Sequence, residues 1–351
     1  MARVFTTETE ETDEARRSRS RAPARLLRRA FGGWGGEEGW RSARTWRRGW
    51  VTAVLAVFLG LALMLHSVIP NTIGNLGSLW ETFLPWGGLF IPVLLLIALI
   101  RRSVTALAAL LVPLIAWLSL FGGLLTDRGS TGGDFTVVTH NVNAGNPDPV
   151  ATARQLKGSG ADVIALEEIA GRRIKVYERE LADAYPYHDV RGTVGIWSAH
   201  PLRDSEPVDI GMGWTRALRT TVETPQGQVA VYVAHLPSVR VQFRSGFTAG
   251  RRDVSAEMLG QRIEDDPVPR LVLLGDLNGT MNDRALAPVT SQLRSTQGAS
   301  GRGMGFSWPA SFPMARIDQI MVKGLEPASS WTMEPTGSDH LPVAASMNFP
   351  K

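Results

Sequence analysis

Carboxylate, amide and imidazole side chains recur at the points where apolar runs of this sequence stop. A stable apolar strand does not need such groups, and burying one of them without a partner costs several kcal/mol. One cluster would be a turn or a helix cap, whereas six clusters of the same residue types suggest a shared site. Carboxylate and amide oxygens suit Mg²⁺ or Mn²⁺. The clusters are Asn141 with Asn143, Glu167 with Glu168, His235, Asp276 with Asn278, Asp318, and Ser338 with Asp339 and His340.

The order of these motifs resembles that of the endonuclease/exonuclease/phosphatase (DNase I-like) superfamily, which includes pancreatic-type DNases, abasic-site endonucleases, neutral sphingomyelinases and inositol polyphosphate phosphatases. The resemblance covers about residues 135–349. It implies a four-layered α/β sandwich with its site at one end of two packed sheets, and hydrolysis of a phosphoester by metal-assisted attack of water. The motifs that carry it are Asn141, LEE (166–168), GIWS (195–198), HLP (235–237), GDLN (275–278), ID (317–318) and SDH (338–340).

The resemblance implies a metal ligand at Glu168, which matches the Glu of the family's LQE motif. Glu167 replaces the Gln of that motif, so the ligand could be displaced by one position. Strand alternation brings only one of the two carboxylates into the site, and the motif register favours Glu168. Asn141 matches the Asn that positions metal and phosphate, and Asn143 falls where relatives often carry Asp.

The remaining matches concern the groups around the phosphate and the water. Asp276 and Asn278 match the family's GDxN motif, and Asp318 and His340 resemble its Asp–His pair. Asp339 resembles the acidic residue beside that pair, which adds a third candidate metal ligand to Glu168 and Asn141. His235 resembles the second histidine of the nuclease and sphingomyelinase branches.

Phosphoester chemistry assigns roles to these groups. A phosphodiester anion repels nucleophiles, so a cation must neutralise the developing charge. The attacking water needs a base, and a histidine pKa near ~6.5 suits neutral pH. We therefore expect His340 to act as the base and Asp318 to orient its ring, as in triad logic. Asp276 orients the water or protonates the leaving group, and Asn141, Asn278 and His235 hold phosphate oxygens.

Strand-like and helix-like segments alternate from residue 134 to residue 351, as expected for a layered α/β or α+β domain. Short apolar runs that end in a polar cluster predict strands. Helices are predicted at 150–160 and 255–265. The predicted strands lie at 135–142, 162–169, 192–199, 228–236, 270–278, 317–322 and 341–349.

Three uncharged apolar segments precede this domain, at 51–70, 82–100 and 103–125. At roughly 1.5 Å per residue each could cross a hydrocarbon core, and none shows the polar stripe of a soluble helix. The sequence therefore predicts a membrane region over 51–125, with residues 71–81 as a loop between the first two spans. Residues 126–133 are a short polar linker.

Residues 1–50 predict a disordered cytoplasmic tail, with twelve Arg against seven acidic residues. Arginines before the first span and at 101–102 place the N-terminus in the cytoplasm by the positive-inside rule. Three spans then place the domain from residue 134 outside. The whole chain carries a net charge of +4 and no cysteine, which excludes disulfides and a cysteine nucleophile.

The leading hypothesis for function is a membrane-anchored, divalent-metal phosphoesterase that acts on a lipid- or envelope-linked phosphate. A short tether would hold the site close to lipid head groups, and the layout is similar to that of actinobacterial membrane proteins linked to teicoplanin-type antibiotic resistance. One alternative is an extracytoplasmic nuclease, which the net charge of −2 over residues 126–351 disfavours. Another is a catalytically inactive membrane scaffold. The arginines at 240, 244, 251 and 252 predict either a solvated loop or a positive rim that recruits an anionic head group.

Overall fold

The computed structural model describes residues 48–242 and 246–350. These residues form two compact units. Of these described residues, one unit contains those up to Leu63 together with Gly87–Ala116, and the other contains Met64–Trp86 together with those from Trp117 onward. The predicted disordered tail lies outside the described residues except for its last three positions.

The predicted membrane region is helical, but only the third of the three expected spans is matched in length by a continuous apolar helical run. Among the described residues, only the run Val104–Leu125 is long and apolar enough to cross a membrane by itself. A second crossing requires the pair Leu76–Thr82 and Leu84–Ile100 to count as one span, although it bends by 74°. Three spans therefore stay a prediction. The apolar helices are α3 (Trp50–Met64), α5 (Phe90–Ile100), α6 (Val104–Ala109) and α7 (Leu111–Phe121).

Residues 71–81, which we expected as a loop, contain most of the short helix α4 (Leu76–Thr82). Its polar residues are satisfied by side chains from distant parts of the same unit. Glu81 is fully buried and its Oε2 accepts from the backbone N–H and the Nε of Arg284, at 3.2 and 3.3 Å. These contacts fix α4 against the C-terminal domain. Short 3₁₀ turns border the apolar helices at η2 (His66–Val68), η3 (Leu84–Leu89) and η4 (Gly122–Leu125).

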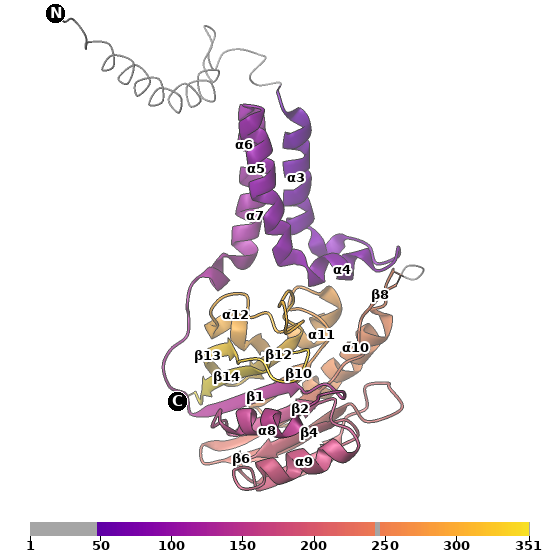
Figure 1. The fold of residues 1–351 in the computed structure, drawn as a ribbon, viewed down its shortest axis with the longest axis vertical. Helices are drawn as coiled ribbons and strands as arrows, with labels where there is room; N and C mark the ends of the chain where they lie inside the picture. The colour runs from indigo at the N-terminus through magenta and orange to yellow at the C-terminus, as the bar shows by residue number, and fades with distance from the viewer. Residues whose placement is uncertain (1–47, 243–245, 351) are drawn as a thin grey trace, which may run out of the picture. The chain divides into compact units, whose positions relative to one another are not determined.

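Two six-stranded sheets make up the C-terminal domain (Figure 1). The first has the order β13-β14-β1-β2-β4-β3, and β1 and β2 are its parallel pair. Because β1 and β2 are parallel, their carboxyl ends lie at the same edge of the sheet. Its strands are β1 (Phe135–Asn141), β2 (Val163–Glu167), β3 (Tyr187–Arg191), β4 (Val194–Ser198), β13 (Glu326–Thr332) and β14 (Val343–Asn348).

The second sheet has the order β11-β12-β10-β7-β6-β5, with β7 and β10 parallel. Strand β12 runs antiparallel to β10, and its first residue, Asp318, pairs with the last residue of β10, Asp276. Its strands are β5 (Leu202–Pro207), β6 (Ala217–Thr224), β7 (Gly227–Ala234), β10 (Leu271–Asp276), β11 (Arg294–Ser295) and β12 (Asp318–Lys323), and a separate ribbon joins β8 (Val241–Gln242) to β9 (Gly246–Phe247).

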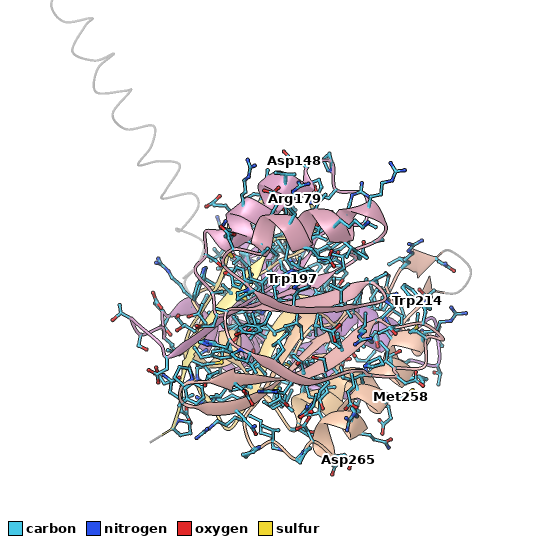
Figure 2. All side chains as sticks on the ribbon, turned by 90° about the horizontal axis from the view of Figure 1, so that it is seen from below. Asp148, Arg179, Trp197, Trp214, Met258 and Asp265 are labelled. Atoms are coloured by element: carbon cyan, nitrogen blue, oxygen red, sulfur yellow. The ribbon has the colours of Figure 1, made fainter. Side chains whose placement is uncertain are left out.

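Helices cover the outer faces of both sheets, which gives the expected layered α/β architecture. Valines and leucines such as Val137, Val231 and Leu274 fill the core between the sheets. Figure 2 shows Trp197 beneath one helical layer and Met258 on the opposite side of the domain. The helices are α8 (Pro149–Lys157) and α9 (Arg172–Leu181) on the first sheet, α10 (Gly250–Glu264), η5 (Arg284–Leu286) and α11 (Ala287–Thr290) on the second, and the short α12 (Thr296–Ser300).

The seven predicted strands are present, and the strands missing from the prediction lie mostly at sheet edges. Strands β3 and β13 end the first sheet, and β5 and β11 end the second. Residues of β3 and β5 are largely exposed or half-buried. An edge strand of this kind has no continuous apolar run, so its sequence lacks the signal that identifies the buried central strands.

Gly275 allows β10 to approach β7 closely just before Asp276. Its φ is +135°, and a Cβ there would lie 2.1 Å from the Ala234 carbonyl oxygen. We expect Gly275→Ala to lower the free energy of unfolding by about 2–4 kcal/mol, because both backbone strain and a steric clash oppose it. Urea or thermal unfolding of the purified protein measures this. The matched control is Gly250→Ala, at the first position of α10 with open space around it. Equal stability of the two variants would contradict the argument.

Candidate active site

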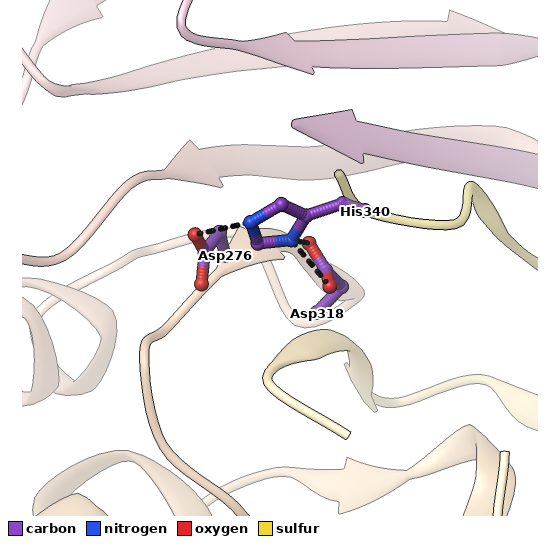
Figure 3. Close-up of side chains that lie close together, drawn as sticks. All are labelled: Asp276, Asp318 and His340. Carbon is purple, nitrogen blue, oxygen red and sulfur yellow. Dashed lines mark hydrogen bonds and ion pairs between the residues drawn. The ribbon is translucent and has the colours of Figure 1, made fainter. Parts of the chain in front are cut away.

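His340, Asp318 and Asp276 form the centre of a buried polar cluster (Figure 3). The Nδ1 of His340 lies 3.0 and 3.1 Å from the two carboxylate oxygens of Asp318. Its Nε2 lies 3.9 Å from Oδ2 of Asp276. One ligand atom from each of the three residues falls within 4.8 Å of the others. The imidazole therefore lies between two carboxylates. Asp276 is the last residue of β10 and Asp318 is the first residue of β12, and these two strands are paired in one sheet.

Burial and charge set the protonation of this cluster. Burial by itself would lower the pKa of His340, but Asp318 and Asp276 outweigh it and raise that pKa to about 10. Burial raises the pKa of Asp276 to about 7, against the opposing effect of His340. Burial also acts to raise the pKa of Asp318, but His340 and a hydrogen bond from Ser307 hold it below its usual value. At neutral pH His340 is a cation and Asp318 an anion.

A second set of contacts ties Asp276 to the other sheet. The Nδ2 of Asn141, at the end of β1, donates to Oε1 of Glu168 at 3.3 Å and to Oδ2 of Asp276 at 3.1 Å. The backbone N–H of Asn278 donates to Oδ1 of Asp276 at 2.9 Å. The amide of Asn141 thus holds two carboxylates from different sheets side by side.

Glu168 and Glu167 have different environments. Strand β2 ends at Glu167, which is fully buried, and the Thr139 hydroxyl donates to its Oε1 at 2.7 Å. Glu168 follows with a φ of +60° and lines the polar pocket. Burial raises the pKa of Glu167 well above its usual value. Of the two carboxylates, Glu168 is the one available to a ligand.

His235 directly follows β7 and lies beside Glu168 and Asp276. Its Nε2 is 3.7 Å from Oε1 of Glu168 and 3.6 Å from Oδ2 of Asp276, and neither ring nitrogen has a hydrogen-bond partner. Burial, together with the nearby cations Arg216 and His340, lowers the pKa of His235 well below its usual value. A neutral, unpartnered imidazole beside two carboxylates can donate to an oxygen of a bound substrate.

Arg216 is a charged residue of this region that the sequence analysis missed. It is 8 % exposed, and its Nε has no hydrogen-bond partner. The negative charges of Asp276 and Glu168 act on its pKa, although burial dominates and lowers it. An arginine just before a strand carries no distinctive sequence pattern, and only the pairing of β6 with β7 brings it beside His235.

A pocket of about 430 Å³ opens onto these groups. Glu168, Asp276, Asn278, Asp339 and His340 all line it. The exposed Asp339 accepts from Nδ2 of Asn143 at 2.7 Å. Asn141, His235 and Asp318 contact the lining residues directly. The structure thus brings together all eight residues that the sequence singled out as catalytic, phosphate-binding or metal-binding.

The four arginines after His235 do not behave as a group. Arg240 lines the pocket. Arg252 is fully buried and its Nη2 lies 2.7 Å from Oδ2 of Asp283, so neither a solvated loop nor a positive rim describes it. Arg244 lies outside the described residues. Arg251 is exposed but does not line the pocket, so of the arginines that the structure describes here only Arg240 lies at the pocket.

The donor set fits a divalent cation. Asp276, Asp318 and His340 each offer a ligand atom to one small volume, and Glu168 lies beside Asp276 through Asn141. Burial raises the pKa of Asp276 to about 7, and a bound cation would favour its ionised form. Glu168, Asp339 and Asn141 carry oxygen atoms of the kind that Mg²⁺ and Mn²⁺ prefer.

The adjacent glutamates provide a matched pair of variants. We expect Glu168→Gln to weaken Mn²⁺ binding by at least about 10–100-fold, because it removes a charged ligand. Glu167→Gln should leave the affinity near that of the wild type. Calorimetric titration of the purified protein with Mn²⁺ measures both, and equal affinities for the two variants would contradict the assignment.

Glu167→Gln also makes a prediction about pH. Because the folded-state pKa of Glu167 is raised, its stabilising contribution is present below its ordinary value of 4.5 and is lost as pH rises toward the folded value. The unfolding midpoint of Glu167→Gln should therefore rise relative to the wild type as pH increases above 4.5. Thermal unfolding between pH 4 and 9 shows this, and a constant difference would argue against a raised pKa.

Comparison with known proteins identifies the family. The Endonuclease/Exonuclease/phosphatase family profile matches residues 138–340, more than half of the chain. No curated protein matches the chain.

Solved structures share the fold at low sequence identity. D. rerio TDP2 complexed with a single-strand DNA product is 16% identical with a TM-score of 0.52, over 61% of this chain and 98% of that one. An endonuclease/exonuclease/phosphatase family protein from Bacteroides thetaiotaomicron is 15% identical with a TM-score of 0.51, over 62% and 98%. A functionally unknown conserved protein from Enterococcus faecalis V583 is 15% identical with a TM-score of 0.51, over 61% and 99%. The family match and the shared fold agree, and the chain belongs to the endonuclease/exonuclease/phosphatase family.

Proposed function

We propose that this protein is an Mg²⁺- or Mn²⁺-dependent phosphoesterase, anchored to the cytoplasmic membrane, that hydrolyses a lipid- or envelope-linked phosphoester outside the cytoplasm. Family membership supports phosphoester hydrolysis. The observation that carries the proposal is the convergence of Glu168, Asp276, His340 and their partners on one pocket. A metal there would neutralise charge on the phosphate and would lower the pKa of the attacking water.

The protein's own residues divide the work of hydrolysis. Asp318 and Asp276 raise the pKa of His340 to about 10. Asp318 holds Nδ1 of His340, whose Nε2 faces Asp276. His340 and Asp276 are therefore the two groups placed to exchange protons with the attacking water and the leaving group. Glu168, Asn141 and Asp339 would hold the metal, and Asn278 and His235 lie beside them to bind phosphate oxygens.

Two features support a substrate at a membrane. Helices α3, α5 and α7 expose large apolar side chains, including Phe58, Ile100 and Ile115, at 69, 72 and 65 %. Exposed apolar surface of this extent is typical of helices in contact with lipid. Thr82 of α4 lines the pocket, and it precedes the start of α5 by only eight positions. The pocket is thus built in part by the segment that joins two apolar helices. A link to teicoplanin-type resistance stays a prediction from the layout.

A nuclease is the second candidate, since the TDP2 structure holds a DNA product. The net charge of −2 over residues 126–351 disfavours a polyanionic substrate. The third candidate is an inactive scaffold. It does not explain why the chain buries several carboxylates and pairs His340 with Asp318, since burying charged groups costs free energy.

The first test is a substrate screen with variants. We expect the purified protein with Mg²⁺ or Mn²⁺ to hydrolyse lipid phosphates faster than plasmid DNA, and EDTA to abolish turnover. His340→Ala and Asp276→Asn should each lower kcat by about 10²–10⁴-fold, because each removes a group that holds or moves a proton. His200→Ala is the matched control, since His200 pairs with Asp162 away from the pocket. Faster cleavage of DNA would favour the nuclease, and no hydrolysis with any metal would favour the scaffold.

Topology is tested separately. Alkaline phosphatase fused after the last residue should be active in intact cells, because three spans with a cytoplasmic N-terminus place the domain outside. A reporter that is active only in the cytoplasm, such as green fluorescent protein, should stay dark at the same position after Sec-dependent export. The opposite pattern would place the pocket in the cytoplasm and remove envelope substrates from consideration.

A further inference from the structure

A second cavity, of about 390 Å³, lies beside the active-site pocket. Thr82 borders both cavities, but none of the proposed metal ligands or proton-transfer groups lines the second one. Its wall comes from the end of α7 and the residues after it, from the loop after β10, and from the segment that leads into β12. The lining residues used below are Arg128, Arg316, Gln319, Phe121, Leu124 and Phe306.

Arg316 gives this cavity an unsatisfied positive charge. It is 6 % exposed, and only its Nη1 is bonded, to Oε1 of Gln297 at 2.9 Å and to the carbonyl of Gly305 at 3.3 Å. Its Nε and Nη2 have no hydrogen-bond partner. Asp318, two residues later, is engaged by His340 and Ser307. Within residues 48–242 and 246–350, no carboxylate forms an ion pair with Arg316.

Other buried arginines in the same unit show the contrast. Arg219, also 6 % exposed, donates to both carboxylate oxygens of Asp266 at 3.0 and 3.2 Å. The Nη2 of Arg252 lies 2.7 Å from Oδ2 of Asp283. An unpaired buried cation costs several kcal/mol, and a paired one is far less costly. Burial lowers the pKa of Arg316 only to about 10, so it stays charged at neutral pH. An anion in the cavity would supply the missing partner.

The rest of the wall is amphipathic. A second guanidinium, that of Arg128, lines the cavity, and the side-chain oxygen of Gln319 is buried without a donor. Phe121 and Leu124, at the end of the apolar run Val104–Leu125, supply an apolar wall together with Phe306. A ligand that satisfies both parts carries an anionic group with a hydrogen-bond donor and an apolar portion.

We propose that this cavity is a second binding site, in which Arg316 and Arg128 hold the phosphate group of an anionic amphiphile while Phe121, Leu124 and Phe306 contact its apolar portion. A phospholipid head group with a hydroxyl donor has this chemistry, and free phosphate shares its charged part. The site is separate from the hydrolytic pocket, and binding there requires neither the metal nor turnover.

The experiment measures binding by the full chain in neutral detergent with EDTA present, so that failure of the proposed hydrolysis does not affect it. The probes are dihexanoyl phosphatidylglycerol, dihexanoyl phosphatidylcholine and inorganic phosphate, each titrated by calorimetry. We expect phosphatidylglycerol to bind at least tenfold more tightly than the other two. Equal binding of inorganic phosphate would assign the site to the free anion and overturn the lipid part. No binding of any probe would overturn the proposal.

Arg316→Met tests the residue that carries the inference. We expect it to weaken phosphatidylglycerol binding at least tenfold, while the unfolding midpoint without ligand stays equal or rises, because an unpaired buried charge is removed. Arg219→Met is the matched control and should show the reverse, a lower midpoint with unchanged binding. Arg128→Ala, at an exposed position, should weaken binding without changing the midpoint, and it keeps the test open if Arg316→Met fails to fold. Unchanged binding in both Arg316→Met and Arg128→Ala would overturn the proposal.

Discussion

The site depends on carboxylates that the fold buries close to one another. Glu168 and Asp276 come from different sheets, yet both lie within hydrogen-bonding distance of Asn141. Asp318 is held on the other side of Asp276 by His340. Burial raises the pKa of Asp276 to about 7, the charge of His340 opposes that rise, and the charge of Asp318 adds to it. A cation in the pocket would offset part of the cost of burying these carboxylates.

The geometry of the two sheets explains why these carboxylates meet. The carboxyl ends of the parallel strands β1 and β2 supply Asn141 and Glu168, and those of β7 and β10 supply His235 and Asp276. The antiparallel strand β12 begins at the same edge with Asp318. A slip of one residue in β10 would turn Asp276 to the opposite face, so the close packing at Gly275 also protects the chemistry.

Sequence alone predicts most of the buried strands, but it misses β6 (Ala217–Thr224), which is buried and whose run of Arg and Thr residues gives no apolar signal. The central strands appear as apolar runs that end in polar residues, whereas β3, β5 and β13 lack that signal because they lie at edges. Strand alternation brings only one of Glu167 and Glu168 into the site, and the motif register favours Glu168. The structural reason is different. Strand β2 ends at Glu167, and Glu168 has a left-handed backbone conformation, so its side chain no longer follows the alternation of the strand.

The residues that sequence could not predict are those placed by tertiary packing. The pairing of β6 with β7 places Arg216 beside His235. Contacts of α4 with distant segments, including Glu81 with Arg284 and with Thr280, accompany the position of Thr82 at the pocket. The periodicity of 71–81 gives no sign of either contact, since α4 is too short to show an apolar stripe. Polar contacts between distant segments are specified by the whole fold and not by local pattern.

The four buried arginines among the described residues differ in how their charge is balanced. Arg219 and Arg252 are each neutralised by a buried aspartate and serve the fold. Arg216 lies near the carboxylates of Asp276 and Glu168, and its positive charge helps to balance theirs. Arg316 alone among these four faces a cavity with no acid to pair it. Thr82, at the end of α4, borders both cavities. Helix α4 would therefore contribute to the two sites in which we propose that phosphate binds, the active-site pocket and the second cavity.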